Sequence, residues 1–363
     1  MSDCPITAKS QEYISFFLGC PTQDGFVTNI HSLIASEGYF TYIIKGGPGT
    51  GKSSLMKLSA SSLKELDKPE LYFCSSDPGS LDAVIFPRLK VIIIDGTAPH
   101  VVEPEYPGAS QSIVNLGECW KPELLKESKR DIISATRRNL KYHALVRRYL
   151  KVIASLNEDL MSIGESCMNI EKLDSYCERL AQKLLCKKSQ KSKTAGETFY
   201  KQISSVTPEG VLTLSQSFEG MSVYAVDDAL FSVSDRLLKA ISKRATECGY
   251  DVTVGTSVFH GGKVYKELII PELKTAFING KHESAAKINA LRFYDKWALK
   301  EKKGRILFDR GIAAEFINEA VQALKSAKAV HDELESYYIR AMDFDEVTKR
   351  ANRLIEEIKT LRA

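Results

Sequence analysis

Several common functional signatures are missing from this 363-residue sequence. Its eight cysteines include no C-x-x-C pair, and no histidine stands at zinc-finger spacing from them, which argues against a zinc site. No apolar run approaches the ~20 residues that cross a bilayer. The beginning, MSDCPITAKSQEY, lacks the basic and then apolar pattern of a signal peptide. We therefore expect a cytoplasmic chain with reduced thiols and no membrane partner.

The chain also lacks a strong excess of charge. Its net charge of +4 is the difference between 50 basic and 46 acidic side chains. Such a weak field argues against nucleic acid as the main partner. With 44% hydrophobic and 26% charged residues, the composition is that of a globular protein long enough for two domains.

The strongest motif that is present indicates a phosphate-binding P-loop. Residues 41–57 read TYIIKGGPGTGKSSLMK, and Gly46, Gly51, Lys52 and Ser53 fill the fixed positions of G-x-x-x-x-G-K-[ST]. In that motif the glycines let backbone N–H groups point at one phosphate, the lysine reaches the β- and γ-phosphates, and the serine hydroxyl binds Mg²⁺. We expect ATP and Mg²⁺ as cofactors. The expected nucleotide-binding residues are Gly46, Gly47, Pro48, Gly49, Thr50, Gly51, Lys52, Ser53 and Ser54.

A Walker B strand is the natural partner of this loop. The run VIIID ends at Asp95, which predicts a carboxylate at the end of a buried strand beside the P-loop. We expect Ser53 and Asp95 to hold the metal and Lys52 and Asp95 to be catalytic. No glutamate follows Asp95, and the Asp-x-x-Gly and Asn-Lys-x-Asp signals of a GTPase are missing. This pattern favours ATP over GTP and slow turnover.

The second half of the chain repeats the first. Residues 147–187 match 321–361 at an offset of 174, and residues 84–95 match 268–279 at an offset of 184. The apolar skeleton is kept, but the chemical residues are not. At the positions of Gly46, Gly51, Lys52, Ser53 and Asp95 the second copy has Asp228, Val233, Ser234, Asp235 and Asn279. A degenerate copy of this kind should not bind nucleotide in the P-loop manner.

The fold class that these patterns predict is α/β, with tandem P-loop NTPase-like domains. In the first half we expect strands at 40–45, 71–75 and 90–95 and a helix at 52–66, giving a parallel sheet with helices on both faces. Each half should end in an α-helical hairpin, because apolar residues recur at helical spacing there. The hairpin helices are expected at 122–163 and 169–187, and at 300–341 and 344–361. The expected domains are 1–188 and 200–363, joined by a polar linker at 189–199.

Two further acidic residues follow the second strand. Asp77 occupies a rim position where kinases often carry a catalytic carboxylate, although Ser-Ser-Asp-Pro is also ordinary turn chemistry. We treat Asp77 as a catalytic candidate and expect Asp82 to be structural.

A longer loop and four arginines distinguish the first half. The change of offset from 184 to 174 means that residues 97–112 contain ten extra residues. This loop carries His100, a catalytic candidate, with Glu103, Glu105 and Tyr106; loops also vary in length without consequence. On the following helix Arg137, Arg138, Arg147 and Arg148 have no basic counterparts. One could stabilise a transferring phosphoryl group, or all could form a solvated helix face.

With these residues in view, the chain resembles a bacterial, Firmicutes-type family of tandem P-loop ATP-binding proteins, often labelled ATPases or nucleotide kinases. The strongest matches are IIKGGPGTGKSSLMK, CSSDPGSLD and IDGTAPHVVEPEYPGA running into NLGECW. The resemblance implies ATP binding at residues 46–54 and Asp95, and it supplies no substrate. The degenerate second copy departs from members in which both halves keep a P-loop.

We therefore expect slow ATP hydrolysis or phosphoryl transfer by the N-terminal half, with the C-terminal half as a pseudo-NTPase scaffold in contact with it. Two alternatives remain open at this point. One is a small-molecule or nucleotide kinase with an unknown small-molecule or protein acceptor. The other is a non-catalytic, ATP-gated interaction module.

Overall fold

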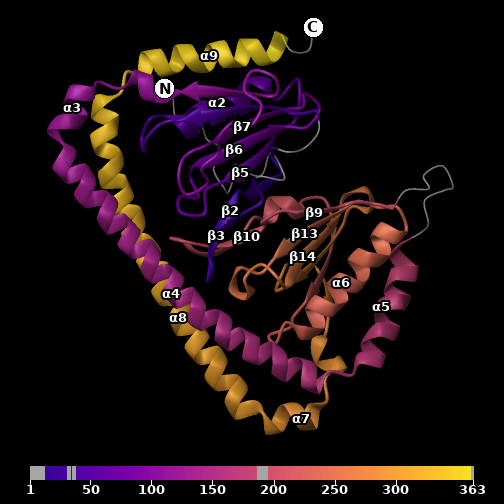
Figure 1. Ribbon diagram of the computed structural model, residues 1–363. Coiled ribbons are helices and arrows are strands. Elements are labelled where there is room, and N and C mark those ends of the chain that lie inside the picture. Colours follow the sequence, from indigo (N-terminus) through magenta and orange to yellow (C-terminus); the bar gives the residue numbers. More distant parts are fainter. Residues whose placement is uncertain (1–12, 31–33, 35–37, 186–194, 284, 361–363) are drawn as a thin grey trace.

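The computed structural model describes residues 13–30, 34, 38–185, 195–283 and 285–360. In this part the chain forms two six-stranded sheets, one in each half, surrounded by helices (Figure 1). The α/β class expected from the sequence is confirmed at this level.

The first sheet has the strand order β1-β5-β6-β7-β4-β8. Its strands are β1 (Ser15–Phe17), β4 (Phe40–Lys45), β5 (Glu70–Phe73), β6 (Leu81–Phe86), β7 (Val91–Asp95) and β8 (Gln111–Asn115). Strand β4 pairs in parallel with β7 and β8, and β1 with β5, but β6 is antiparallel to both β5 and β7. The sheet is therefore mixed, which corrects the expectation of a parallel sheet. Only residues 87–90 join β6 to β7, and so short a connection makes a hairpin and not a parallel crossover.

The second sheet has the order β16-β12-β15-β14-β13-β9, which repeats the order of the first sheet when it is read from the opposite edge. Its strands are β9 (Thr198–Tyr200), β12 (Ser222–Val226), β13 (Val252–Thr256), β14 (Tyr265–Ile270), β15 (Thr275–Asn279) and β16 (Ala286–Ile288). Lys90 and Lys274, which align at the offset of 184, close the matching turns with left-handed φ values of 56° and 46°. The internal repeat is thus present in the fold as well as in the sequence.

The remaining strands and the short helices lie outside the two large sheets. Two hairpins are formed by β2 (Gly19–Thr22) with β3 (Gly25–Thr28) and by β10 (Ser204–Thr207) with β11 (Gly210–Thr213). Short 3₁₀ helices cover Leu116–Cys119, Ser215–Phe218, Val258–His260, Pro271–Leu273 and Ala290–Phe293.

The helix expected at 122–163 is divided at Ser128 and extends to Cys167, whereas the other expected helices lie close to their expected bounds. The helices are α2 (Lys52–Leu63), α3 (Pro122–Glu127), α4 (Lys129–Cys167), α5 (Ile170–Leu184), α6 (Ser232–Glu247), α7 (Lys296–Glu301), α8 (Lys303–Ala341) and α9 (Phe344–Thr360). Among these helices none is long and apolar enough to cross a membrane.

The two hairpins are exchanged between the halves, which corrects the expectation that each hairpin closes its own half. Helices α4 and α8 run side by side in opposite directions along one flank of the molecule (Figure 1). As a result α5 packs beside α6 of the second half, and α9 packs beside α2 of the first. Matching contacts hold both exchanged hairpins in place. One isolated β-bridge joins Trp120 to Met342 and another joins Met168 to Tyr294, and these two pairs are equivalent at the repeat offset of 174.

The hydrophobic core between each sheet and the helices that cover it therefore contains side chains from both halves. Leu354 and Ile358 of α9 belong to the core formed by α2 and the first sheet, and Leu173 of α5 belongs to the core of the second sheet. The other faces of the two sheets share a third cluster, which includes Ile92 and Ala276. The second face of each sheet thus packs in part against the other half, which corrects the expectation of helices on both faces.

The expected linker is only partly described. Residues 186–194 lie outside the described residues, and Thr198–Tyr200 form β9, which pairs in parallel with β13. The six described cysteines are free thiols.

Candidate functional site

The glycine-rich segment 46–54, here called the glycine loop, joins β4 to α2. Gly49 and Gly51 adopt left-handed φ values of 66° and 89°, a conformation that glycine takes without strain. Gly51 is the N-cap of α2, and no side chain caps this helix. The backbone N–H groups of the first turn are therefore available to an anion, which the helix dipole also favours.

Lys52 and Asp95 meet beside this loop. Asp95 ends β7, and the parallel register pairs it with Ile44 of β4, directly before the loop. The Lys52 Nζ donates to the carbonyl oxygens of Gly46 and Gly47 at 3.1 and 2.7 Å and lies 3.5 Å from the Asp95 carboxylate. The fold thus brings together the two residues that the sequence proposed for phosphate and metal.

Ser53 lies on the first turn of α2, as a metal-binding hydroxyl would require. Its Oγ accepts a hydrogen bond from the backbone N–H of Leu81 at 2.9 Å. The Asp95 carboxylate accepts bonds from the N–H and hydroxyl of Thr97 at 2.9 and 2.6 Å. The Ser53 hydroxyl has two lone pairs and accepts one bond, and both Thr97 bonds end on the same Asp95 oxygen, so each residue has a lone pair with which it could bind another ligand.

A second carboxylate and a histidine lie next to Asp95. The antiparallel register pairs Ala83 with Ile94, so Asp82 stands across from Asp95 on the neighbouring strand. One ligand atom from each of Asp82, Asp95 and His100 lies within 4.8 Å of the others, and all three residues are buried. His100 Nε2 is 3.8 Å from Asp82 Oδ2.

Burial in this cluster favours the uncharged forms of two of its groups. Burial, and then the nearby Asp95 charge, raise the pKa of Asp82 to about 8. Burial also lowers the pKa of His100. Among the residues that the structure describes, Asp82 Oδ2 and His100 Nδ1 have no hydrogen-bond partner. Unpartnered buried polar atoms of this kind fit a metal ion, a water or a reacting hydroxyl.

Asp82 is the residue that sequence reasoning undervalued. It stands second in β6, and its position beside Asp95 depends on the antiparallel pairing that the sequence analysis did not foresee. The sequence signal for this position is the short segment 87–90, because so short a connection between two strands requires antiparallel pairing and so places Asp82 beside Asp95.

Asp77 lies apart from this cluster. Its carboxylate accepts a hydrogen bond from Ser80 Oγ at 2.6 Å and is 3.6 Å from Lys328 Nζ of helix α8. The structure therefore places Asp77 at the rim, facing the second half of the chain.

The long loop 97–112 brings one of its four candidate residues inward. His100 is buried, whereas Glu103, Glu105 and Tyr106 are exposed. Lys45 Nζ anchors the loop by donating to the carbonyl oxygens of Gly96 and Val102 and to the Glu103 carboxylate. These bonds fix the start of the loop, which places His100 in the buried cluster beside Asp82 and Asp95.

The four arginines of α4 form a solvated face. All four are exposed, and Arg138 pairs with Glu333 of α8 at 2.5 Å. In the described structure no hydrogen bond or ion pair joins them to the glycine loop, which fits the simpler of the two interpretations.

The segment 228–236 of the second half, here called the counterpart loop, aligns with the glycine loop and contains a buried carboxylate of its own. Buried Asp228 stands at the position of Gly46 and accepts hydrogen bonds from the N–H groups of Leu230 and Ser234 at 3.1 and 2.9 Å and from the Tyr294 hydroxyl at 2.9 Å. Asp235 accepts from the Tyr265 N–H at 2.8 Å, just as Ser53 accepts from the Leu81 N–H. The counterpart loop therefore keeps equivalent contacts, but its backbone N–H groups donate to the Asp228 carboxylate of the chain itself.

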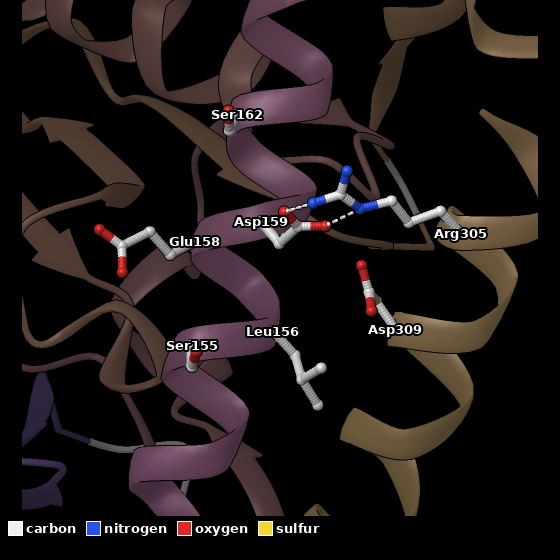
Figure 2. A pocket seen from close by; sticks show the side chains of 7 residues that line it. All are labelled: Ser155, Leu156, Glu158, Asp159, Ser162, Arg305 and Asp309. Carbon is white, nitrogen blue, oxygen red and sulfur yellow. Dashed lines mark hydrogen bonds and ion pairs between the residues drawn. The ribbon is translucent and has the colours of Figure 1, made fainter.

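A pocket of about 460 Å³ lies elsewhere, between α4 and α8. Figure 2 shows Arg305 holding Asp159 with two hydrogen bonds while Asp309 points toward the pair. Burial, and then the hydrogen bond with Asp159, raise the pKa of Asp309. This arrangement is an ion pair between the two long helices, distant along the chain from the glycine loop.

Comparisons of this chain with family models, curated proteins and solved structures found no match.

Proposed function

We propose that this chain is a P-loop NTPase that binds ATP and Mg²⁺ at the glycine loop of its N-terminal half. The observation that carries the proposal is the convergence of the uncapped α2 N-terminus, Lys52 and Asp95 at one edge of the first sheet. Open α/β sheets commonly bind ligands at the carboxyl ends of their strands, and this convergence lies at such an end.

The residues at this edge fit a triphosphate. A methyl group on Gly46 would lie 2.7 Å from the Thr50 hydroxyl oxygen, so this position suits a residue without a side chain. Lys52 would leave its carbonyl partners for the β- and γ-phosphates, and residues 46–54 would supply backbone donors. Ser53 and Asp95 would hold Mg²⁺. The metal, when bound, neutralises charge on the phosphates.

The chemistry in this proposal is slow hydrolysis or transfer of the γ-phosphoryl group. The neutral imidazole of His100 would accept the proton of an attacking water or acceptor hydroxyl and the protonated Asp82 would orient that group, because both residues lie beside Asp95 and carry unpartnered polar atoms. The C-terminal half would be a pseudo-NTPase scaffold, since Asp228 takes the donors that a phosphate would need. The proposal includes a cytoplasmic location and membership of the tandem P-loop family that the motifs resemble.

A second candidate function is a non-catalytic, ATP-gated module. It is favoured by one contact: helix α8 of the second half lies directly on the glycine loop, where the Gly49 N–H donates to Glu335 at 3.2 Å. Nucleotide could then change the packing of the halves without turnover.

Measuring ATP binding and ADP release separates the two candidates. The wild-type chain and Lys52→Ala are titrated with ATP and Mg²⁺ by calorimetry, and ADP release is followed with and without a panel of small-molecule acceptors. Binding that is lost in Lys52→Ala supports the nucleotide site. ADP release that falls in His100→Gln by about 10² or more supports proton transfer, and binding without any release supports the gated module.

A further inference from the structure

Helix α8 of the C-terminal half covers the glycine loop of the N-terminal half. Besides the Gly49 to Glu335 hydrogen bond, a methyl group on Gly49 would lie 2.9 Å from the backbone oxygen of Glu335. A methyl group on Gly47 would lie 2.6 Å from the Tyr338 ring. Two glycines of the loop therefore permit the close approach of this helix, in addition to any role in phosphate binding.

The internal repeat shows that this contact is chemically specialised. By the exchange of hairpins, α4 approaches the counterpart loop in the same way, and Gly164 packs against Leu230 and Ser232. At the offset of 174, however, the residues differ in character. The α8 residues Lys328, His331, Glu335 and Tyr338 correspond to Ala154, Asn157, Met161 and Gly164 of α4. At these four positions, ionisable side chains thus occur only on the helix that approaches the loop with the lysine.

In both halves a carboxylate accepts a hydrogen bond from loop N–H groups, but the two differ in how firmly they are held. Asp228 is part of its own loop, is buried, and has three donors. Glu335 comes from a helix 286 residues away, has a side chain 31% exposed, and takes one N–H of the loop. Glu335 is therefore held by fewer loop donors and is more exposed to solvent than Asp228.

The surroundings of Glu335 keep it ionised. His331 Nε2 lies 3.4 Å from its carboxylate, and this contact is the largest cause of the lowered pKa of Glu335. Lys328 lies one turn further along the helix, paired with Asp332 at 2.5 Å and near Asp77.

We propose that Glu335 is a resident anion of the glycine loop, which a nucleotide phosphate displaces, so that binding at the N-terminal half releases helix α8 of the C-terminal half. This inference rests on the proposed nucleotide site. A phosphate held by the loop needs the Gly49 N–H, and a carboxylate at hydrogen-bond distance from the same group repels it. Because α8 continues into α9, which packs on α2, the displacement couples the site to the contact between the halves.

The test compares Glu335→Gln with Glu333→Gln, a control two residues away that removes the same charge from α8 but pairs with Arg138. Each protein is titrated with ATP and Mg²⁺ and with tripolyphosphate. We expect Glu335→Gln to bind both about tenfold more tightly than the wild type, because a competing charge is removed, and the control to change less than about twofold. Glu335→Ala, which also removes the acceptor, should bind at least as tightly as Glu335→Gln. Hydrogen exchange of residues 328–341 in the wild type should increase when ATP is added.

The outcomes distinguish the inference from the proposed function. If the wild type binds ATP and both Glu335 variants bind it with unchanged affinity, the inference is overturned and the nucleotide site stands. If only the Glu335 variants bind, Glu335 blocks the loop permanently and no phosphate displaces it, which overturns both the displacement and the proposed function of the wild-type chain. If no variant binds ATP or tripolyphosphate, both are wrong.

Discussion

Replacing Asp228 by alanine tests whether the counterpart loop depends on its internal carboxylate. The substitution removes the acceptor of two backbone N–H groups, from Leu230 and Ser234, and of the Tyr294 hydroxyl. Hydrogen bonds to a charged group typically contribute about 1.5–3 kcal/mol each, so the gross loss is roughly 4–9 kcal/mol.

Part of that loss is offset, because the wild-type protein must bury a charge. Burial raises the pKa of Asp228 even though three donors favour its ionised form. We therefore expect a net destabilisation of about 2–4 kcal/mol, within the range for breaking a buried polar network. The midpoint temperature of thermal unfolding should fall by about 3–5 °C.

The control is Asp227→Ala, which removes the same charge from the exposed neighbouring residue. Differential scanning calorimetry of both variants is repeated with sulfate. If the loop is an anion site occupied by Asp228, sulfate should restore about 1–2 kcal/mol to Asp228→Ala and leave the control unaffected. Equal stability of the two variants, or no selective effect of sulfate, would refute the reasoning.

Two further predictions concern single positions. Burial lowers the pKa of His260 to about 4, whereas an unfolded histidine titrates near ~6.5, so only the unfolded chain takes up this proton as the pH falls between these values. The wild type should lose about 1.4 kcal/mol of stability per pH unit in that window relative to His260→Gln, with no difference in slope above pH ~7; parallel denaturation profiles of the two proteins would contradict this. Gly47→Ala should destabilise the protein by about 1–3 kcal/mol, because the added methyl meets the Tyr338 ring. In a Tyr338→Ala background the same change should cost little, and an undiminished cost in the double-mutant cycle would show that the ring is not the cause.

The sequence was sufficient for most elements because their signals are local. The strand at 40–45 and the long helices follow from alternating or helical apolar spacing, and the observed bounds of β4, α8 and α9 agree with them. The matched halves likewise predicted two sheets of one design.

What could not be predicted depends on contacts distant in sequence. A hairpin packed on its own half and one packed on the other half have the same apolar periodicity, so the exchange of α5 and α9 leaves no mark in the pattern. The same holds for Glu335, whose partner Gly49 is 286 residues away. Lys52 and Asp95 were predictable because motif spacing fixed them, whereas Asp82 required the strand direction.

The central claim is that the N-terminal glycine loop binds one nucleotide and the counterpart loop none. Isothermal titration of the wild-type chain with ATP in the presence of Mg²⁺ tests it most directly, with Lys52→Ala as the comparison. The account predicts one ATP per wild-type chain and loss of most of the affinity in a folded Lys52→Ala protein, because the ammonium group that meets the phosphates is removed. Two nucleotides per wild-type chain, or unchanged affinity in the variant, would contradict it.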